Sequence, residues 1–127
     1  MTTTLLLVLM LQGGRVRPPE DLPCSRDHLT SFTGKVISYS RAPGRITLRI
    51  RTDWDTTERV AVTHGKGEAP EPWFRLWGAA FQAADWKKIE DSANRLKPGM
   101  RATAWVCEKG SGASQNPRID WLPPRNE

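Results

Sequence analysis

The stretch Arg45-Ile-Thr-Leu-Arg-Ile-Arg51 decides the fold class, because its apolar and polar residues alternate without interruption. In an extended chain Ile46, Leu48 and Ile50 point to one side, and the arginines and the threonine between them point to the other. A strand of this kind buries one face and leaves the other in water, as strands of antiparallel sheets do. The sequence therefore predicts a mainly β protein.

Four further segments, on both sides of this stretch, have the composition or the alternation of strands. They span residues 32–39, 58–63, 100–107 and 118–122. Between the segments lie turn signals such as Ala42-Pro43-Gly44 and the glycine- and serine-rich residues 110–116. Within the segments, the side chains expected to face the core are Val60, Val62, Ala102, Ala104 and Val106.

One stretch, residues 73–96, has helical spacing instead of alternation. Its apolar residues recur mainly at intervals of three and four, which predicts a helix with one buried stripe. Asp85 is a suitable N-cap, so one bent helix and two short helices both remain open. Trp73 and Trp77 lie on the apolar stripe and are expected to fill the core rather than to bind a ligand.

Three strands, a helix and two strands, in that order, resemble the oligonucleotide/oligosaccharide-binding (OB) fold. Phe32-Thr-Gly-Lys-Val36 is similar to the first strand of such barrels. The run Leu96-x-Pro-Gly-Met-x-Ala-x-Ala-x-Val106 is similar to the sequence that leads into their fourth strand. The resemblance covers residues 32–122 and implies a five-stranded antiparallel barrel with the helix between strands three and four. Small exported bacterial proteins of this fold are the nearest group.

The barrel topology also implies a partner for each cysteine. Its first strand pairs antiparallel with its fourth, so the residues before the first strand lie near the end of the fourth. Cys24 precedes the first predicted strand, and Cys107 ends the fourth. We therefore predict a Cys24–Cys107 disulfide that pins residues 15–31 across the barrel, with Trp105 pointing outward beside it. The alternative is two free thiols in a cytosolic protein.

The N-terminal residues 1–14, MTTTLLLVLMLQGG, carry no charged side chain and contain one apolar run. This run is too short to cross a bilayer but long enough for the apolar core of a secretory signal. A buried N-terminal strand of a cytosolic protein is the alternative. We predict a periplasmic or secreted protein with an extension (15–31), an OB-type domain (32–122) and a C-terminal tail (123–127).

Groups that could perform catalysis are scarce in this sequence. His28 and His64 are the only histidines and belong to no motif, and no zinc, phosphate-loop or dinucleotide motif occurs. Asp53, Asp55 and Glu58 offer oxygen ligands for a cation such as Ca²⁺, but their spacing is not that of an EF-hand. A polar hairpin connection satisfied by its own side chains is preferred. We therefore expect a protein that is not an enzyme and needs no cofactor or metal.

The candidate binding residues are arginines on the outward side of the second and third predicted strands. The chain has a formal net charge of +5, and arginine pairs well with phosphate and carboxylate. Binders of single-stranded nucleic acid combine such charge with exposed aromatic side chains. The alternative is an ordinary polar outer face with acidic residues nearby. The proposed ligand-binding residues are Arg45, Arg49, Arg51 and Arg59, flanked by Tyr39 and Trp54.

These features together predict an exported, non-enzymatic binding or assembly module. Its partner is expected to be a protein or an anionic polymer of the cell envelope, because a basic domain attracts acidic partners. The alternative is a single-stranded nucleic-acid-binding protein that uses the basic face of strands two and three. Export argues against that alternative, since exported proteins rarely meet nucleic acid.

Overall fold

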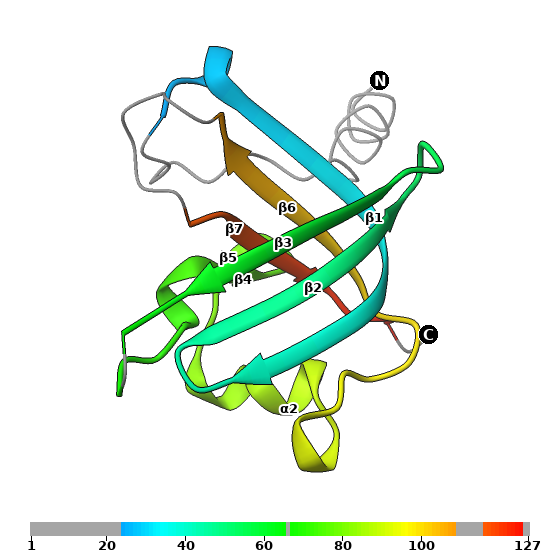
Figure 1. The fold of residues 1–127 in the computed structure, drawn as a ribbon. Coiled ribbons are helices and arrows are strands. Elements are labelled where there is room, and N and C mark those ends of the chain that lie inside the picture. Colours follow the sequence, from blue (N-terminus) through cyan, green and yellow to red (C-terminus); the bar gives the residue numbers. More distant parts are fainter. Residues whose placement is uncertain (1–23, 66, 109–115, 126–127) are drawn as a thin grey trace, which may run out of the picture.

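The computed structural model describes residues 24–65, 67–108 and 116–125 (Figure 1). Its strands form one sheet in the order β3-β2-β1-β6-β7-β4-β5. The signal predicted for residues 1–14 and most of the predicted extension lie outside the described residues. The strands are β1 (Leu29–Ala42), β2 (Arg45–Thr52), β3 (Thr57–Thr63), β4 (Phe74–Leu76), β5 (Ala79–Ala80), β6 (Arg101–Cys107) and β7 (Arg118–Leu122).

Short helical segments occupy the connections. The four-residue α-helix α2 (Trp86–Ile89) lies between β5 and β6, below the sheet in the view of Figure 1. No helix in the described ranges has the length and apolar character needed to cross a bilayer. The 3-10 turns are η1 (Arg26–His28), η2 (Glu71–Trp73), η3 (Ala83–Asp85) and η4 (Ser92–Asn94).

The prediction of a mainly β protein is confirmed. The five predicted strands correspond to β1, β2, β3, β6 and β7. Ile46, Leu48 and Ile50 are fully buried, and the arginines between them are exposed. Most of the other side chains expected inside are buried as well, and Val106 is half-buried. Alternation therefore predicted the buried face of β2 and β3 correctly, whereas in β6 Trp105 and Cys107, expected outside, are buried as well.

Strand β1 is long because it pairs with two strands in turn. Leu29–Lys35 pairs antiparallel with β6, and the part from Gly34 to Ala42 pairs antiparallel with β2. At Gly34 a Cβ atom would lie 2.0 Å from the carbonyl oxygen of Arg51, so only glycine fits where the two strands converge. The pairing of the first predicted strand with the fourth is confirmed by this register.

The closed five-stranded barrel is not confirmed. β7 pairs with β6 on one side and, in parallel, with the short strand β4 on the other, so it has no edge left for β3. A side chain links β3 and β7 instead. The Asn116 amide accepts from the backbone N–H of Thr63 (3.0 Å) and donates to its C=O (2.6 Å). The sheet is therefore open, and the Asn116 side chain, two residues before β7, joins it to the end of β3.

The helix predicted over residues 73–96 is wrong for most of its length. Trp77 and Gly78 have positive φ angles of 49° and 83° and turn the chain between β4 and β5. Trp77 is 44 % exposed, so its predicted core role is wrong, whereas Trp73 packs against the core. Asp85 accepts a bond from the backbone N–H of Gln82 (2.8 Å) and so caps η3 rather than α2.

The predicted disulfide is present. Cys24 and Cys107 are bonded, with their Cα atoms 5.9 Å apart. The β1–β6 pairing continues up to this bridge, because the backbone N–H of Glu108 donates to the C=O of His28 (2.7 Å). Trp105 is buried, with 8 % of its surface exposed. A disulfide of this kind is typical of proteins in oxidising compartments.

Candidate binding face

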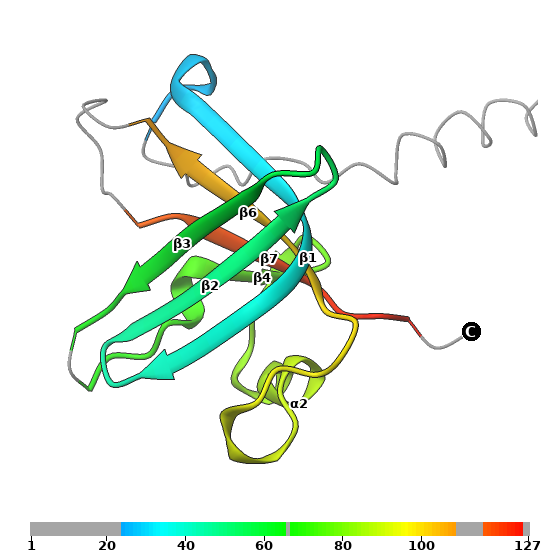
Figure 2. The ribbon, with the colours of Figure 1, turned by 45° about the vertical axis from the view of Figure 1, so that its right-hand side comes forward.

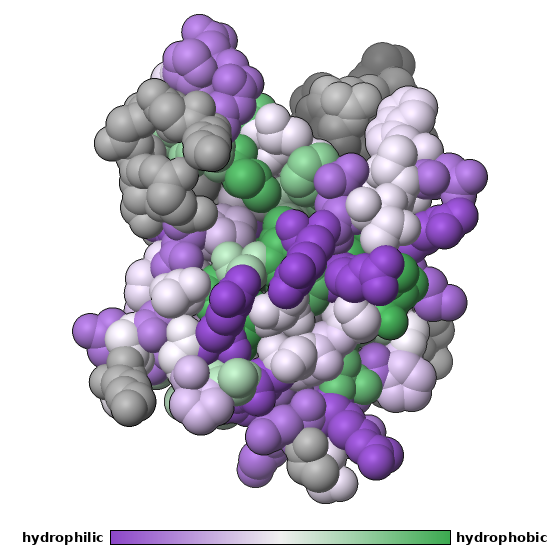
Figure 3. All heavy atoms as spheres, in the orientation of Figure 1, coloured by the Kyte–Doolittle hydropathy of each residue, from purple (hydrophilic) through white to green (hydrophobic). Residues whose placement is uncertain are grey.

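The predicted arginine row lies on β2 and β3, on the outer face of the sheet, where hydrophilic side chains gather (Figure 3). The register places Arg49 directly opposite Arg59 and Arg51 opposite Lys35. Within the described ranges, four cations on this face form no ion pair. These four, termed the basic face, are Lys35, Arg45, Arg49 and Arg59.

The pair Arg49 and Arg59 is the most unusual feature of the basic face. Like charges directly opposite each other on neighbouring strands destabilise a sheet. Glu58 is the acidic residue next to Arg59, but it lies opposite Ile50 and so leaves its strand from the other face. No carboxylate in the part of the chain that the structure describes therefore neutralises this pair.

Two neighbouring cations are neutralised. Arg51 pairs with Asp55 at 2.5 Å, so this predicted binding residue is already engaged. Arg101 holds both carboxylate oxygens of Asp53, at 2.8 and 3.0 Å. The acidic residues of the β2–β3 loop thus act as ion-pair partners. The described residues contain no group of three or more metal-ligating side chains.

Tyr39 does not join the basic face, contrary to the sequence prediction. A β-bulge at Ile37 shifts the register between Val36 and Ser38 and turns Tyr39 inward, opposite Leu48. Its ring stacks edge-on against Trp121, with 5.9 Å between centroids. Burial, and then a hydrogen bond donated to Glu90, raise the pKa of the Tyr39 hydroxyl well above its usual range. This side chain therefore belongs to the core.

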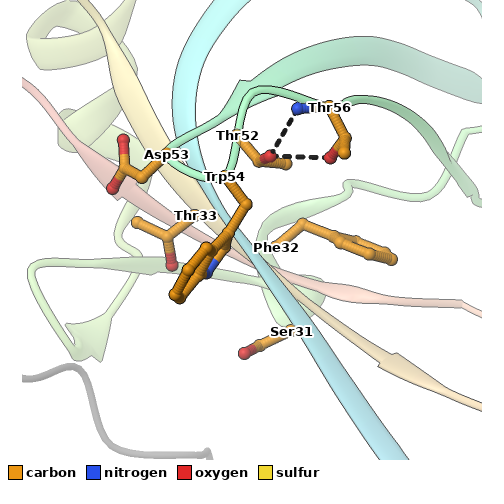
Figure 4. A pocket seen from close by; sticks show the side chains of 7 residues that line it. All are labelled: Ser31, Phe32, Thr33, Thr52, Asp53, Trp54 and Thr56. Atoms are coloured by element: carbon orange, nitrogen blue, oxygen red, sulfur yellow. Dashed lines mark hydrogen bonds between the residues drawn. The ribbon is translucent and has the colours of Figure 1, made fainter.

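Trp54 is the exposed aromatic side chain that the sequence predicts, with 89 % of its surface in solvent. It lies in the β2–β3 loop and extends toward β1 (Figure 4). Under it is a pocket of about 290 Å³, here termed the Trp54 pocket. Three hydrogen bonds between Thr52 and Thr56 hold the loop, among them a bond of 2.7 Å between the two hydroxyls. The lining residues are Ser31, Phe32, Thr33, Thr52, Asp53, Trp54 and Thr56.

Two clusters around carboxylates were not predicted. Glu90 accepts bonds from Tyr39 and from Arg41 (2.8 Å) and ties the end of β1 to the segment after α2. Asp120 in β7 is 2 % exposed and accepts a bond from the backbone N–H of Gly78 (2.9 Å). Burial raises the pKa of the Asp120 carboxyl. The burial of Asp120 could not be predicted from the sequence, because an acidic residue on the outward side of a strand is normally exposed.

Each of the two histidines contacts a glutamate residue. His64 Nδ1 bonds to the backbone C=O of Glu68 (2.6 Å), and His28 lies 3.7 Å from the carboxylate of Glu108. The basic face offers charges for electrostatic contact, and Trp54 offers an exposed indole. Comparison with protein-family models, curated proteins and solved structures finds no match to this chain.

Proposed function

We propose that this chain is an exported, non-enzymatic binding module of the OB type that holds an anionic cell-envelope polymer on its basic face. The observation that carries the proposal is the opposed pair of Arg49 and Arg59 without an acidic partner in the described ranges. A bound phosphate or carboxylate would lie between two guanidinium groups and relieve their repulsion. An anion from outside the chain would therefore remove a repulsion of about 0.2–1 kcal/mol that the described residues alone do not relieve.

The spacing of the cations suits a repeating polyanion better than a single small anion. Arg45 and Arg49 are four residues apart on β2, which corresponds to about 13 Å along the strand. Arg59 lies on the neighbouring strand, about 5 Å away across the sheet. A polymer that crosses β2 and β3 can therefore contact several cations with successive charged groups.

Two structural features support the OB-type and export parts of the proposal. Strand β1 is shared between β2 and β6, and the short helical segments precede β6, which is the strand order expected of an OB domain. The Cys24–Cys107 disulfide favours an oxidising compartment outside the cytoplasm. A polymer of the cell envelope is an anionic partner that such a protein meets.

The alternative partner, single-stranded nucleic acid, requires aromatic platforms among the cations. Tyr39 packs inside the protein, and Trp54 lies over a pocket beside β1 rather than between Arg49 and Arg59. The exposed apolar side chain next to Arg49 is Ile37, which offers no ring for stacking. These positions favour a polymer recognised by its charge over one recognised by its bases.

Binding of labelled inorganic polyphosphate and of labelled oligo(dT), measured over a salt series, tests the proposal. Polyphosphate is expected to bind at low salt, with affinity falling steeply as salt rises. The Trp54→Ala variant is expected to bind polyphosphate as the wild type does. Tighter binding of oligo(dT), weakened about tenfold or more by Trp54→Ala, would favour the nucleic-acid alternative. No binding of either polymer at low salt would refute both functions.

A further inference from the structure

An open strand edge lies beside the Trp54 pocket, at the start of β1. Pairing between β1 and β2 begins only at Gly34 and Thr52, whereas pairing between β1 and β6 already begins at Leu29. In the described part of the chain, the first residues of β1 therefore have a strand neighbour on one side only. The chain leaves this edge at Thr52, where it turns into the β2–β3 loop.

The backbone of Ser31 faces this open side. The C=O of Thr33 accepts from the N–H of Asp53 (3.0 Å), which shows that Thr33 faces the β2 side. In an antiparallel ladder, residues two apart face the same edge. Two bonds on the β6 side, Val36 N–H to Met100 C=O and Glu108 N–H to His28 C=O, agree with this parity. Ser31 thus directs one donor and one acceptor toward the open edge.

The amino-acid composition of residues 29–33 is unusual for an exposed edge strand. Proteins normally protect such edges with lysine, proline or a bulge. Leu29-Thr-Ser-Phe-Thr33 contains no charged residue and no proline, and it is rich in residues that favour strands. The Trp54 pocket opens directly beside it, with Ser31, Phe32 and Thr33 as one wall (Figure 4). The edge and the pocket together match the pattern by which sheets bind extended peptides.

We propose that an extended segment of a partner protein adds to the sheet along residues 29–33 and places one apolar side chain in the Trp54 pocket. The added strand occupies the position that β2 leaves at Thr52. Lys35 lies two residues beyond Thr33 on the same face of β1 and forms no ion pair within the described ranges, so the segment carries an acidic residue beside it. A second copy of this chain would bring a further net charge of +5, which opposes pairing of like edges.

Selection of a phage-displayed library of random peptides against the full chain provides the test, with the Ser31→Pro variant as counter-selection. Proline removes the N–H that faces the open side and leaves the bonds to β6 in place. Ser31→Ala, which keeps this N–H, is the matched control. We expect enrichment of peptides with an apolar residue flanked by acidic ones, which bind wild type and Ser31→Ala equally. Trp54→Ala should weaken their binding by about tenfold.

A second measurement uses only the wild-type protein, so that it does not depend on the folding of Ser31→Pro. The selected peptide is compared with a copy whose alternate backbone nitrogens are methylated, which keeps every side chain and removes the strand donors. Methylation is expected to weaken binding about tenfold or more. Equal binding of both peptides, or no enrichment over Ser31→Pro, overturns the proposal. A wild-type dimer that Ser31→Pro abolishes overturns it in favour of a second copy.

The proposed function and the peptide-binding inference can be refuted independently of each other. The Arg49→Gln/Arg59→Gln variant is expected to lose polyphosphate binding and to retain the selected peptide, because the peptide edge and the basic face share no residue of that pair. Loss of the peptide in this variant would contradict the inference. Retention of the peptide by a protein that never binds polyphosphate would leave the inference standing and the proposed function refuted.

Discussion

Removal of the Cys24–Cys107 disulfide is expected to destabilise the domain strongly. The bridge joins residues 83 positions apart and connects the start of β1 to the end of β6. A loop of this length restricts the unfolded chain, and the chain-entropy model gives about 4.5 kcal/mol of stabilisation at 25 °C. Unfolding entropy for a domain of this size is about 0.2 kcal/mol/K near the midpoint, so the loss corresponds to a fall in Tm of about 20 °C.

Thermal unfolding followed by circular dichroism measures this loss. Three samples are compared: the oxidised protein, the protein in dithiothreitol, and the Cys24→Ser/Cys107→Ser variant. The second and third are expected to unfold together, well below the first, and dithiothreitol should leave the variant unchanged. A difference below about 1 kcal/mol between oxidised and reduced protein would refute the reasoning, because it would mean that the bridge does not restrict the unfolded chain.

Three further predictions concern stability. Gly34→Ala places a Cβ 2.0 Å from a backbone oxygen and is expected to cost about 3 kcal/mol or more in urea unfolding. Gly67→Ala has open space but a φ of 81°, so it should cost only the backbone strain of about 1–2 kcal/mol, and equal costs would contradict the close approach of β1 and β2. The Asp120 carboxyl has a raised pKa in the folded protein, so its contribution to stability is present at low pH and is lost as the pH rises from the unfolded pKa of about 4 through the folded pKa. The free energy of unfolding of Asp120→Asn should therefore increase relative to that of wild type over this pH range. A difference that does not change with pH would contradict the prediction. Arg49→Thr is expected to raise stability at low salt by about 0.2–1 kcal/mol, because it removes a like-charge pair. Arg51→Thr removes the like charge opposite Lys35 but also breaks the ion pair with Asp55, so it should give no such gain; a gain of equal size in both variants would contradict the distinction.

The sequence pattern was sufficient to predict the five main strands, and alternation predicted the buried face of β2 and β3, which cover one side of the core. The disulfide followed from topology, since the pairing of β1 with β6 brings its two cysteines together. The inward position of Tyr39 could not be predicted. It depends on a bulge at Ile37, where no glycine or proline marks the irregularity.

The segment between β3 and β6 was mispredicted for a different reason. Phe74, Phe81 and Ile89 are buried at intervals that suggest a helix, but they belong to a strand, a connection and a short helix. Each packs into the core separately, and periodicity cannot distinguish this case from one continuous helix. The bridge from Asn116 to β3 was also hidden, because it depends on a side chain that replaces a strand ladder.

The arginines of the candidate site were found from the sequence, but their differences were not. Alternation places all of them outside, whereas only the structure shows that Arg51 is held by Asp55 and that Arg49 faces Arg59. This pairing depends on the register between β2 and β3 and on the shape of their loop. The sequence alone therefore does not distinguish cations that already form ion pairs from those available to bind an anion.

The affinity of two matched double variants for polyphosphate tests most directly whether the opposed arginines are the binding site. Arg49→Gln/Arg59→Gln and Arg51→Gln/Arg101→Gln remove the same charge, but only the first removes cations without an acidic partner in the described ranges. At low salt, the first variant is expected to bind polyphosphate about tenfold or more weakly than the second, because charged hydrogen bonds are lost only there. Equal affinity of the two variants would contradict the proposed site.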